Sequence, residues 1–477
     1  MRRRGFLKTA AAGAGLLILR SGMLRGADAP SNKLNIAMIG TWGRADAHFG
    51  VLKSENIVAL CDVNEDHLAH AAKMFPNAKT YVDWRKVFDQ KDINAVVCCT
   101  TDFTHAFIAN WALNRNLHIY CEKPIGNCVE ECRVVRANYL KRKDKVATQV
   151  GTQRHAIDNF ARVKELVRDG AIGELQAAYA WGDRNIPKPG YMVGEGQPPD
   201  NFHYDLWLGP SPYHPYNAGY FKGGPGANCL SWNMYWDFGS GQIGDMGSHT
   251  MDLAWNALDA DLPTSAEAEG EKYNPDVTPP SMHTSFDIPA NDWRKEIRLH
   301  WYQGGGGMFP NPPPGFGDVS RFGHGAMFKG TQGFIVADFD QRVVIPYGKE
   351  ANMTYYKPRP KDQLIPPLGG FQQEWINAAK GNMKTTCNFD YGGKLIETML
   401  LGLLAYRVWP QFLPDQVKEV PASKDKGKGK GPKQQGPPLF TGPKKLEYDG
   451  AKGRVTNCEE ANQLISRKYR EGWVLDG

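Results

Sequence analysis

The sequence lacks long apolar runs, a paired-cysteine framework and a broadly basic surface. After residue 30, no stretch has the length or purity of a membrane span. The nine cysteines include no C-x-x-C pair, and Cys61, Cys98 and Cys99 fall in apolar runs. We therefore expect buried free thiols and no metal site, which suits a chain that folds in a reducing compartment.

The net charge of +6 is concentrated in two segments. Residues 1–29 carry +5, and residues 418–445 hold eight lysines against two acids. The remaining body is mildly acidic, so a nucleic-acid partner is not expected. Residues 411–445 form a low-complexity, basic insertion that cannot bury apolar surface, and we expect it to be disordered and solvated. A basic binding tail is the alternative.

The amino terminus has the pattern of an export signal. Arg3 and Arg4 precede a modest apolar run, and Ala27-Asp28-Ala29 offers an A-x-A cleavage site. The paired arginines indicate a twin-arginine signal over residues 1–29, so we expect a periplasmic or otherwise exported protein. That route carries folded proteins, often with a cofactor already bound.

A length of 477 residues with 41% hydrophobic content predicts two globular domains. Residues 34–39 are typical of a buried parallel strand, and a glycine turn, a helix and a second strand at residues 57–60 follow. Strands continue to alternate with helices over about 120 residues, which predicts a doubly wound parallel sheet. We place this dinucleotide-binding domain at residues 30–151, a second domain at 152–410, and a segment that packs back on the body at 446–477.

The first turn approximates a dinucleotide fingerprint. Gly40 and Ala45 fit the G-x-G-x-x-G/A pattern, but Trp42 occupies the middle glycine position and Gly43 comes one place later. Asp62 follows Gly40 by 22 residues, close to the distance expected for the ribose-binding carboxylate. Such a carboxylate repels a 2′-phosphate, so the pattern favours NAD over NADP.

Later strand ends add polar side chains at the edge where open α/β sheets bind ligands. The Glu-Lys-Pro turn is stiffened by Pro124, which would hold Lys123 rigidly over a cofactor. A surface turn is the alternative for that tripeptide, and an ordinary helix position is the alternative for His105. The predicted cofactor-binding residues are Gly40, Trp42, Gly43, Arg44, Asp62, Thr100, Thr101, Asp102, His105, Glu122, Lys123 and Gln153.

The second half begins with a stretch crowded with aromatic residues and then reads as strands between residues 264 and 340, which predicts an antiparallel sheet. Aromatic rings pack on the C–H faces of sugars, and we expect a few of these rings to line a site while most fill the core. The predicted substrate-binding residues are Arg154, Trp232, Tyr235, Trp236, Asp245 and His249.

Asp245 and His249 are one turn apart if this stretch is helical. An imidazole beside a carboxylate can act as a general base. An ordinary structural pair and two ligands of a metal remain alternatives, although no third ligand is evident nearby.

Taken together, these stretches resemble the glucose–fructose oxidoreductase / inositol dehydrogenase / MocA (Gfo/Idh/MocA) family. The resemblance covers roughly residues 34–409 and rests on Thr100–His105, Glu122-Lys123-Pro124, Gly151–Arg154 and Asp245-x-x-x-His249. Trp207-Leu208-Gly209-Pro210 and residues 469–473 look like an exported bacterial branch. Trp42 for glycine and Thr101 for proline are departures from the family pattern.

The resemblance implies a Rossmann domain followed by an α+β domain with a large open, mostly antiparallel sheet, whose free face forms homodimers or homotetramers. It also implies catalysis by Lys123, Asp245 and His249. His249 would take a proton from the substrate, Lys123 would stabilise the oxyanion, and Asp245 would position His249 or the sugar.

We expect an NAD-dependent oxidoreductase that acts on a sugar or glycoside hydroxyl with a tightly bound, internally recycled cofactor, because a periplasm offers no exchangeable NAD. Glycoside cleavage by oxidation, elimination and re-reduction is an alternative, although the histidine segment of the NAD-dependent glycosidases is not evident. A catalytically silent sugar-binding protein is a second alternative.

Overall fold

A computed structural model describes residues 32–475, apart from residues 185, 305–306, 349–355 and 410–441. The predicted export signal at 1–29 and almost all of the predicted insertion at 411–445 lie outside the described residues. Within the described chain, no helix combines the length and the apolar character needed to cross a bilayer.

The first half forms a six-stranded parallel sheet in the order β3-β2-β1-β4-β5-β6. This order is that of two mononucleotide-binding halves, with the crossover between β1 and β4. The strands are β1 (Asn35–Ile39), β2 (Asn56–Cys61), β3 (Lys79–Tyr81), β4 (Ala95–Cys98), β5 (His118–Cys121) and β6 (Thr148–Val150). The connecting helices are α2 (Asp46–Leu52), α3 (Glu65–Met74), α4 (Trp84–Val87), α5 (His105–Asn114) and α6 (Val129–Leu140).

Apart from the exposed edge strand β3, the strands of this sheet are mostly buried, because helices cover both faces. One apolar cluster joins β1, β4 and β5 to α5 and α6, and a second joins the same strands to α2, α3 and the late helix α10. Four apolar residues in a row, such as those of β4, therefore suit a strand that packs on both sides.

The second half is built on a nine-stranded sheet in the order β13-β12-β11-β7-β10-β9-β8-β14-β15. Within the described chain, β10 and β7 pair in parallel, and the other neighbouring strands of this sheet pair antiparallel. The strands are β7 (Leu175–Gly182), β8 (Ser265–Gly270), β9 (Ser281–Ile288), β10 (Ile297–Gly304), β11 (His324–Gly330), β12 (Gly333–Ala337), β13 (Arg342–Pro346), β14 (Lys445–Asp449) and β15 (Arg454–Val455). The two sheets confirm the predicted fold class, a Rossmann domain followed by a domain with a mostly antiparallel sheet.

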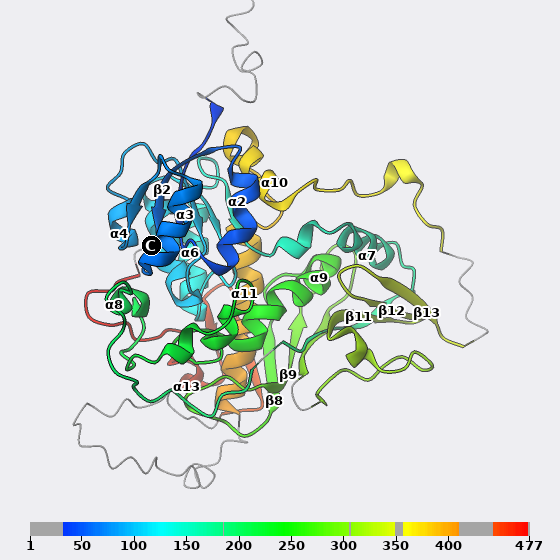
Figure 1. The fold of residues 1–477 in the computed structure, drawn as a ribbon. Helices are drawn as coiled ribbons and strands as arrows, with labels where there is room; N and C mark the ends of the chain where they lie inside the picture. Colours follow the sequence, from blue (N-terminus) through cyan, green and yellow to red (C-terminus); the bar gives the residue numbers. More distant parts are fainter. Residues whose placement is uncertain (1–31, 185, 305–306, 349–355, 410–441, 476–477) are drawn as a thin grey trace, which may run out of the picture.

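Helices pack on one face of the large sheet and connect it to the Rossmann half. Figure 1 shows α11 between the two halves, and its contacts run to α6 on one side and to β8 and β9 on the other. The helices of this half are α7 (Asp158–Arg168), α8 (Tyr204–Leu208), α9 (Ser248–Leu258), α10 (Phe371–Asn377), α11 (Phe389–Val408) and α13 (Glu459–Asn462).

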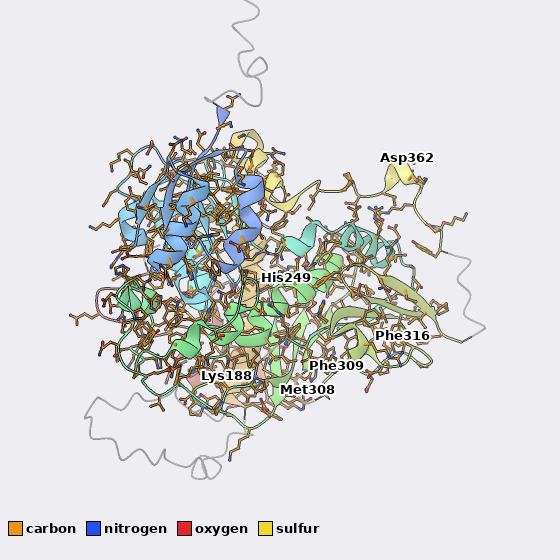
Figure 2. All side chains as sticks on the ribbon, viewed as in Figure 1. Lys188, His249, Met308, Phe309, Phe316 and Asp362 are labelled. Carbon is orange, nitrogen blue, oxygen red and sulfur yellow. The ribbon has the colours of Figure 1, made fainter. Side chains whose placement is uncertain are left out.

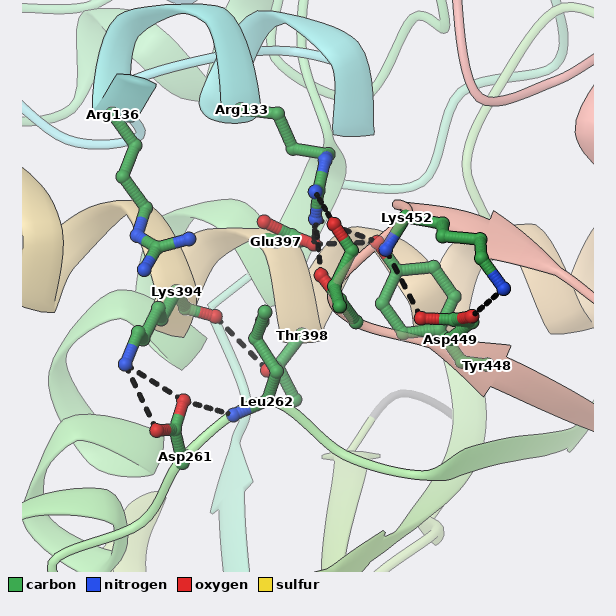
Figure 3. A network of polar contacts seen from close by, with 12 residues as sticks. Arg133, Arg136, Asp261, Leu262, Lys394, Glu397, Thr398, Tyr448, Asp449 and Lys452 are labelled. Carbon is green, nitrogen blue, oxygen red and sulfur yellow. Dashed lines mark hydrogen bonds and ion pairs between the residues drawn. The ribbon is translucent and has the colours of Figure 1, made fainter. Parts of the chain in front are cut away.

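Ion pairs fix α6 to α11 and to the returning strand β14. Figure 3 shows Arg133 of α6 reaching the carboxylate of Glu397, with Nη1 2.7 Å from Oε1, and Tyr448 donating to the same carboxylate. Glu397 is fully buried, whereas the neighbouring pair between Arg136 and Asp390 is partly exposed. The carboxyl-terminal strand thus takes part in the junction between the two halves.

The last described residues return to the Rossmann half. After α13 they run without helix, and Trp473 packs against Trp84 and Phe107. Aromatic packing therefore holds this segment on the other domain.

Candidate functional site

The glycine turn after β1 faces a cavity of about 350 Å³ at the carboxyl end of the parallel sheet. Gly40 has φ +85°, and a Cβ there would lie 2.5 Å from the carbonyl oxygen of Cys99. Both the backbone conformation and the close approach of β4 therefore require glycine. Gly43, with φ +71°, supplies the second left-handed residue of the turn, and the side chain of Asn228 packs against it.

Trp42 does not point into the turn itself. Its backbone is extended, and its ring stacks on His67 of α3 with a centroid separation of 4.7 Å. The indole lines the cavity together with Asp62, as do Thr100 and Thr101 from the next strand end. The bulky residue at the middle glycine position is accommodated because its side chain turns toward α3.

Asp62 holds the turn as well as lining the cavity. One carboxylate oxygen accepts hydrogen bonds from the backbone and the hydroxyl of Thr41, at 2.8 and 3.1 Å, and the other accepts from the amide of Asn64 at 2.9 Å. A carboxylate has about four acceptor positions. Capacity therefore remains for a hydroxyl donor of a ligand.

A segment of the second domain closes this cavity. Residues 199–232, which we call the covering segment, contribute Phe202, Trp207 and Trp232 to its lining. The segment is fastened to the loop after β2 by backbone hydrogen bonds from Glu65 to Asn201 and from His203 to Val63, both of 2.9 Å. The cavity is therefore enclosed from both halves of the chain.

Glu122, expected beside the cofactor, is instead buried in an ion-pair network. It accepts from Arg44 at 2.9 Å and faces His48 Nε2 at 2.8 Å. Burial acts against ionisation, but Arg44 and His48 outweigh it and lower the pKa of Glu122 to about 2. Glu122 and Arg44 thus couple the glycine turn to the Glu-Lys-Pro turn.

His105 likewise ties two strand-end loops together. Its Nδ1 lies 2.7 Å from the carbonyl oxygen of Pro124, and its Nε2 lies 3.1 Å from that of Thr100. Its neighbour Asp102 is buried beside the catalytic group, and burial raises the pKa of Asp102 to about 7. Neither residue lines the cavity described above.

Lys123 and Asp245 meet across the junction of the two domains. Lys123 leaves the end of β5, and its ammonium forms an ion pair with the carboxylate of Asp245. Arg184, which follows β7, lies 3.2 Å from the other carboxylate oxygen. Although burial works the other way, Lys123 and Arg184 hold the pKa of Asp245 below its ordinary value.

Asp245 and His249 lie on one continuous helical stretch, but Asp245 falls in a π-helical turn, Ile243–Gly247, that leads directly into α9. Such turns are rare and are frequent at functional sites. The carboxylate of Asp245 contacts Lys123 and Arg184. Its predicted role in positioning His249 or a sugar stays a prediction.

His249 is buried at the junction of the two halves, where Figure 2 labels it. Neither ring nitrogen has a hydrogen-bond partner among the described residues, and Nδ1 is wholly shielded. Burial, with the positive charge of Lys123, keeps the pKa of His249 well below 6.5. The imidazole is therefore neutral at neutral pH and free to accept a proton.

The remaining predicted residues are distributed over three places. Gln153 has a buried, unpartnered side-chain oxygen, and Arg154 stacks on Phe339 with its guanidinium carbon 4.7 Å from the ring centre. Phe339 also packs edge-on against His249, so Arg154 lies on the catalytic side. Of the predicted aromatic residues, Trp232 lines the cofactor cavity, whereas Tyr235 is fully buried in the core. Trp236 lines a different cavity.

Sequence reasoning missed Arg184 and Asn228. Both act through contacts with residues more than 60 positions away, Asp245 and Gly43. It also missed the contacts behind α9, where Asp252 lies 2.9 Å from His155 Nδ1 and accepts from the phenol of Tyr391 at 2.5 Å. Asp252, three residues after His249, was the one signal available for that network.

Comparison with known proteins agrees with this geometry. Residues 34–152 match the model of the oxidoreductase family with an NAD-binding Rossmann fold, GFO_IDH_MocA, and residues 176–286 match the family's C-terminal alpha/beta domain. The inositol 2-dehydrogenase of Salmonella typhimurium is 29% identical over 120 residues, 25% of this chain and 35% of that protein. The levoglucosan dehydrogenase of Pseudarthrobacter phenanthrenivorans is 32% identical over 117 residues, 24% and 29% of the two chains. The alignments thus span about a third of each relative's length.

Two solved structures share the fold over most of their length. The WlbA dehydrogenase from Bordetella pertussis, in complex with NADH and UDP-GlcNAcA, superposes with a TM-score of 0.56 at 14% identity, over 79% of this chain and 96% of that one. GenD2 from gentamicin A biosynthesis, in complex with NAD, gives 0.51 at 14% identity, over 78% and 94%.

Proposed function

We propose that this chain is an NAD-dependent oxidoreductase of the Gfo/Idh/MocA family that acts on a hydroxyl group of a sugar or glycoside; the family's two models match residues 34–152 and 176–286. The substrate class is supported by relatives whose names specify inositol and levoglucosan. The ring of Phe339 and the exposed Arg154, both beside His249, are consistent with a polar, ring-shaped substrate.

The observation that carries the proposal is the charge arrangement around Asp245. Two cations, Lys123 and Arg184, surround one carboxylate, which leaves a net positive charge beside the neutral imidazole of His249. Fixed positive charge stabilises an oxyanion, and a neutral imidazole can remove the hydroxyl proton that creates it. Lys123 is therefore the electrostatic group, His249 the base, and Asp245 the residue that orients Lys123.

The cavity at the parallel sheet suits a dinucleotide. Gly40 gives the turn its left-handed conformation before the start of a helix, and Asp62 retains acceptor capacity for a ligand hydroxyl. When bound, NAD supplies the acceptor for the hydride that leaves the substrate carbon.

We further propose that the cofactor is held tightly and recycled in place. The covering segment walls the cavity from the side of the second domain, and its attachments to Val63 and Glu65 would have to open before a dinucleotide could leave. This enclosure suits the export expected from Arg3 and Arg4, because an exported enzyme cannot draw on a cytoplasmic NAD pool. Loss of export in an Arg3→Lys/Arg4→Lys variant, measured by cell fractionation, would support the localisation.

The open face of the large sheet is our proposed surface for self-association. Tyr179, His283, His300 and Tyr302 form a stacked, half-buried row on adjacent strands, with centroid separations of 4.3 to 5.3 Å between neighbours. A second copy would cover these rings. Light scattering of wild type and of Tyr302→Arg tests this: a shift toward monomer is expected, and an unchanged mass would exclude the face.

The deciding experiment combines native mass spectrometry with isotope exchange. We expect the purified protein to carry one dinucleotide per chain and to exchange C–H for C–D in one member of a sugar panel, and we expect His249→Asn to keep the dinucleotide but lose exchange. Cleavage of a p-nitrophenyl glycoside without net NADH would establish the glycosidase alternative. Tight sugar binding without exchange would establish the silent binding protein and overturn the proposal.

A further inference from the structure

A second and larger cavity, of about 680 Å³, lies outside the catalytic group. Its walls are the start of α6, one side of α11, the loop from Trp236 to Ser240 and the terminal residues 463–468. Trp236, which the sequence had assigned to the substrate, is part of this wall. Nothing in the catalytic arrangement uses this cavity.

Arg407 of α11 is the unusual group in this cavity. Its guanidinium carbon lies 5.1 Å from the ring centre of Trp236, and it forms no ion pair among the described residues. Its hydrogen bond goes to the phenol of Tyr273, while Nε is shielded and has no partner. Burial lowers the pKa of Arg407, and a partly buried cation without an acid in contact is costly unless a ligand supplies one.

Two further polar atoms of the wall lack partners. The amide of Asn127 donates to the carbonyl of Trp236 at 3.3 Å, which leaves its buried oxygen Oδ1 unsatisfied. Ser240 is only 2% exposed, and its hydroxyl has no partner. An acceptor and a hydroxyl beside an unpaired guanidinium are complementary to a ligand that carries both hydroxyl groups and an acid.

The acids that line the cavity already have partners. Asp237 receives the phenol of Tyr191 and faces His214 Nε2, both at 2.8 Å, and Asp276 accepts from the amide of Tyr191 at 3.2 Å. Neither carboxylate forms an ion pair with Arg407. Arg407 therefore has no carboxylate within ion-pair distance among the described residues, although the charge of Asp237 acts on it from farther away.

The other cations differ from Arg407. Arg467 is neutralised by Glu131, with Nε 2.7 Å from Oε1, whereas Lys468 is exposed at the cavity and forms no ion pair within the described chain. Leu400, Leu403 and Leu404 supply apolar surface on the same face of α11 as Arg407. One partly buried and one exposed cation, neither in an ion pair within the described chain, thus lie next to apolar surface.

We propose that this cavity binds a small hydroxylated carboxylate, such as an aldonic acid, with its carboxylate on Arg407 and its hydroxyls on Asn127 and Ser240. A guanidinium binds a carboxylate through charge-assisted hydrogen bonds, which are the stronger class. The inference does not depend on the proposed oxidoreductase activity, because it rests on residues outside the catalytic group.

The position of the cavity links it to catalysis. The loop from Trp236 to Ser240 leads directly into the helical stretch that contains Asp245 and His249. A ligand that fixes Ser240 would therefore also fix the start of that stretch.

Calorimetric titration of the full-length protein with D-gluconate tests the proposal. D-sorbitol, which lacks the charge, and butyrate, which lacks the hydroxyls, are the comparison probes. We expect gluconate to bind at least about tenfold more tightly than either probe, because each probe loses either the charged hydrogen bonds or the hydroxyl contacts.

Three variants locate the binding. Arg407→Lys keeps the charge but removes Nε, and Leu404→Trp fills the apolar side; each should weaken gluconate binding by about tenfold or more while thermal melting confirms the fold. His249→Asn should leave the affinity unchanged. The proposal is overturned if wild type does not discriminate gluconate from sorbitol, if both cavity variants bind normally, or if His249→Asn alone abolishes binding.

Discussion

Lys123 has two features that an ordinary ion-paired lysine does not share. Its partner Asp245 is almost wholly buried, and the pair lies beside an imidazole without hydrogen-bond partners. The pairing with Asp245 outweighs burial and raises the pKa of Lys123, so the ammonium stays charged wherever the enzyme is folded. Its charge is therefore available to an oxyanion at every working pH.

We predict that Lys123→Met lowers kcat/KM by at least about 100-fold, because the fixed positive charge at the reacting oxygen is lost. The matched control is Lys394→Met, which removes a lysine paired with Asp261 at 2.8 Å on the outside of α11 (Figure 3). Steady-state kinetics on the sugar identified by isotope exchange makes the comparison. Equal activity of the two variants would remove Lys123 from the mechanism.

Single residues were predictable where a local pattern places them at a strand end or on a helix turn. Lys123 and His249 belong to this group. Lys123 forms an ion pair with Asp245, and His249 lies on α9, which directly follows the turn that contains Asp245. The partner of Asp245 was not predictable, because Arg184 approaches from β7 through tertiary packing. Trp236 lines another cavity, which was also not predictable, because aromatic composition does not determine the direction in which a loop presents its side chains.

The glycine turn after β1 is the element on which cofactor binding depends. We predict that Gly40→Ala removes bound dinucleotide and lowers the free energy of unfolding by more than about 1 kcal/mol, because φ is positive and Cys99 blocks the Cβ. Gly50→Ala is the control: nothing lies within 4 Å of its Cβ in α2, and it should stabilise by about 0.5–1 kcal/mol. Native mass spectrometry and urea unfolding measure both effects, and an intact dinucleotide content in Gly40→Ala would contradict this account.

Two neighbouring arginines on α6 give a second comparison between elements. Arg133→Met should cost about 3 kcal/mol or more in unfolding free energy, because it leaves the fully buried carboxylate of Glu397 without its cation. Arg136→Met should cost about 1 kcal/mol or less, since Asp390 is 39% exposed and stays hydrated. Urea denaturation measures the loss in unfolding free energy of both variants. A larger loss in Arg136→Met than in Arg133→Met would contradict the expected order.

Most elements of the Rossmann half could be predicted, because buried strands and amphipathic helices have distinct periods there. The expected alternation of strands and helices over about 120 residues is present, and it includes the helices His105–Asn114 and Val129–Leu140. The π-helical turn before α9 was not predictable, because a one-residue widening leaves no trace in the spacing of apolar residues. The parallel pairing of β10 with β7 arises between strands more than 100 residues apart, beyond the reach of local patterns.

Across the whole molecule, several histidines are kept neutral by burial. Burial is the main cause that lowers their pKa values, with nearby cations adding to it in some cases, and for His300 the value falls to about 3. They are His118, His249, His283, His300 and His324. His155 differs, because Cys387 and Asp252 outweigh burial and raise its pKa.

We predict that stability falls as the pH drops below about 6.5, since the unfolded chain takes up protons that the folded histidines resist. His300→Gln should reduce this loss, because it removes the lowered pKa near 3. Urea midpoints at pH 7 and pH 5 for both proteins provide the measurement. A variant whose midpoint drops as far as that of wild type would show that His300 does not contribute.

The return of the chain end to the Rossmann half restricts how the enzyme can open. Arg467 binds Glu131 of α6, Arg470 binds Asp205 of the covering segment, and Trp473 packs on Trp84. A hinge motion that swung the two halves apart would have to break these attachments together. We therefore expect substrate to enter by local displacement of loops. Because dinucleotide exchange would require these three attachments to break, we expect exchange to be slower than turnover.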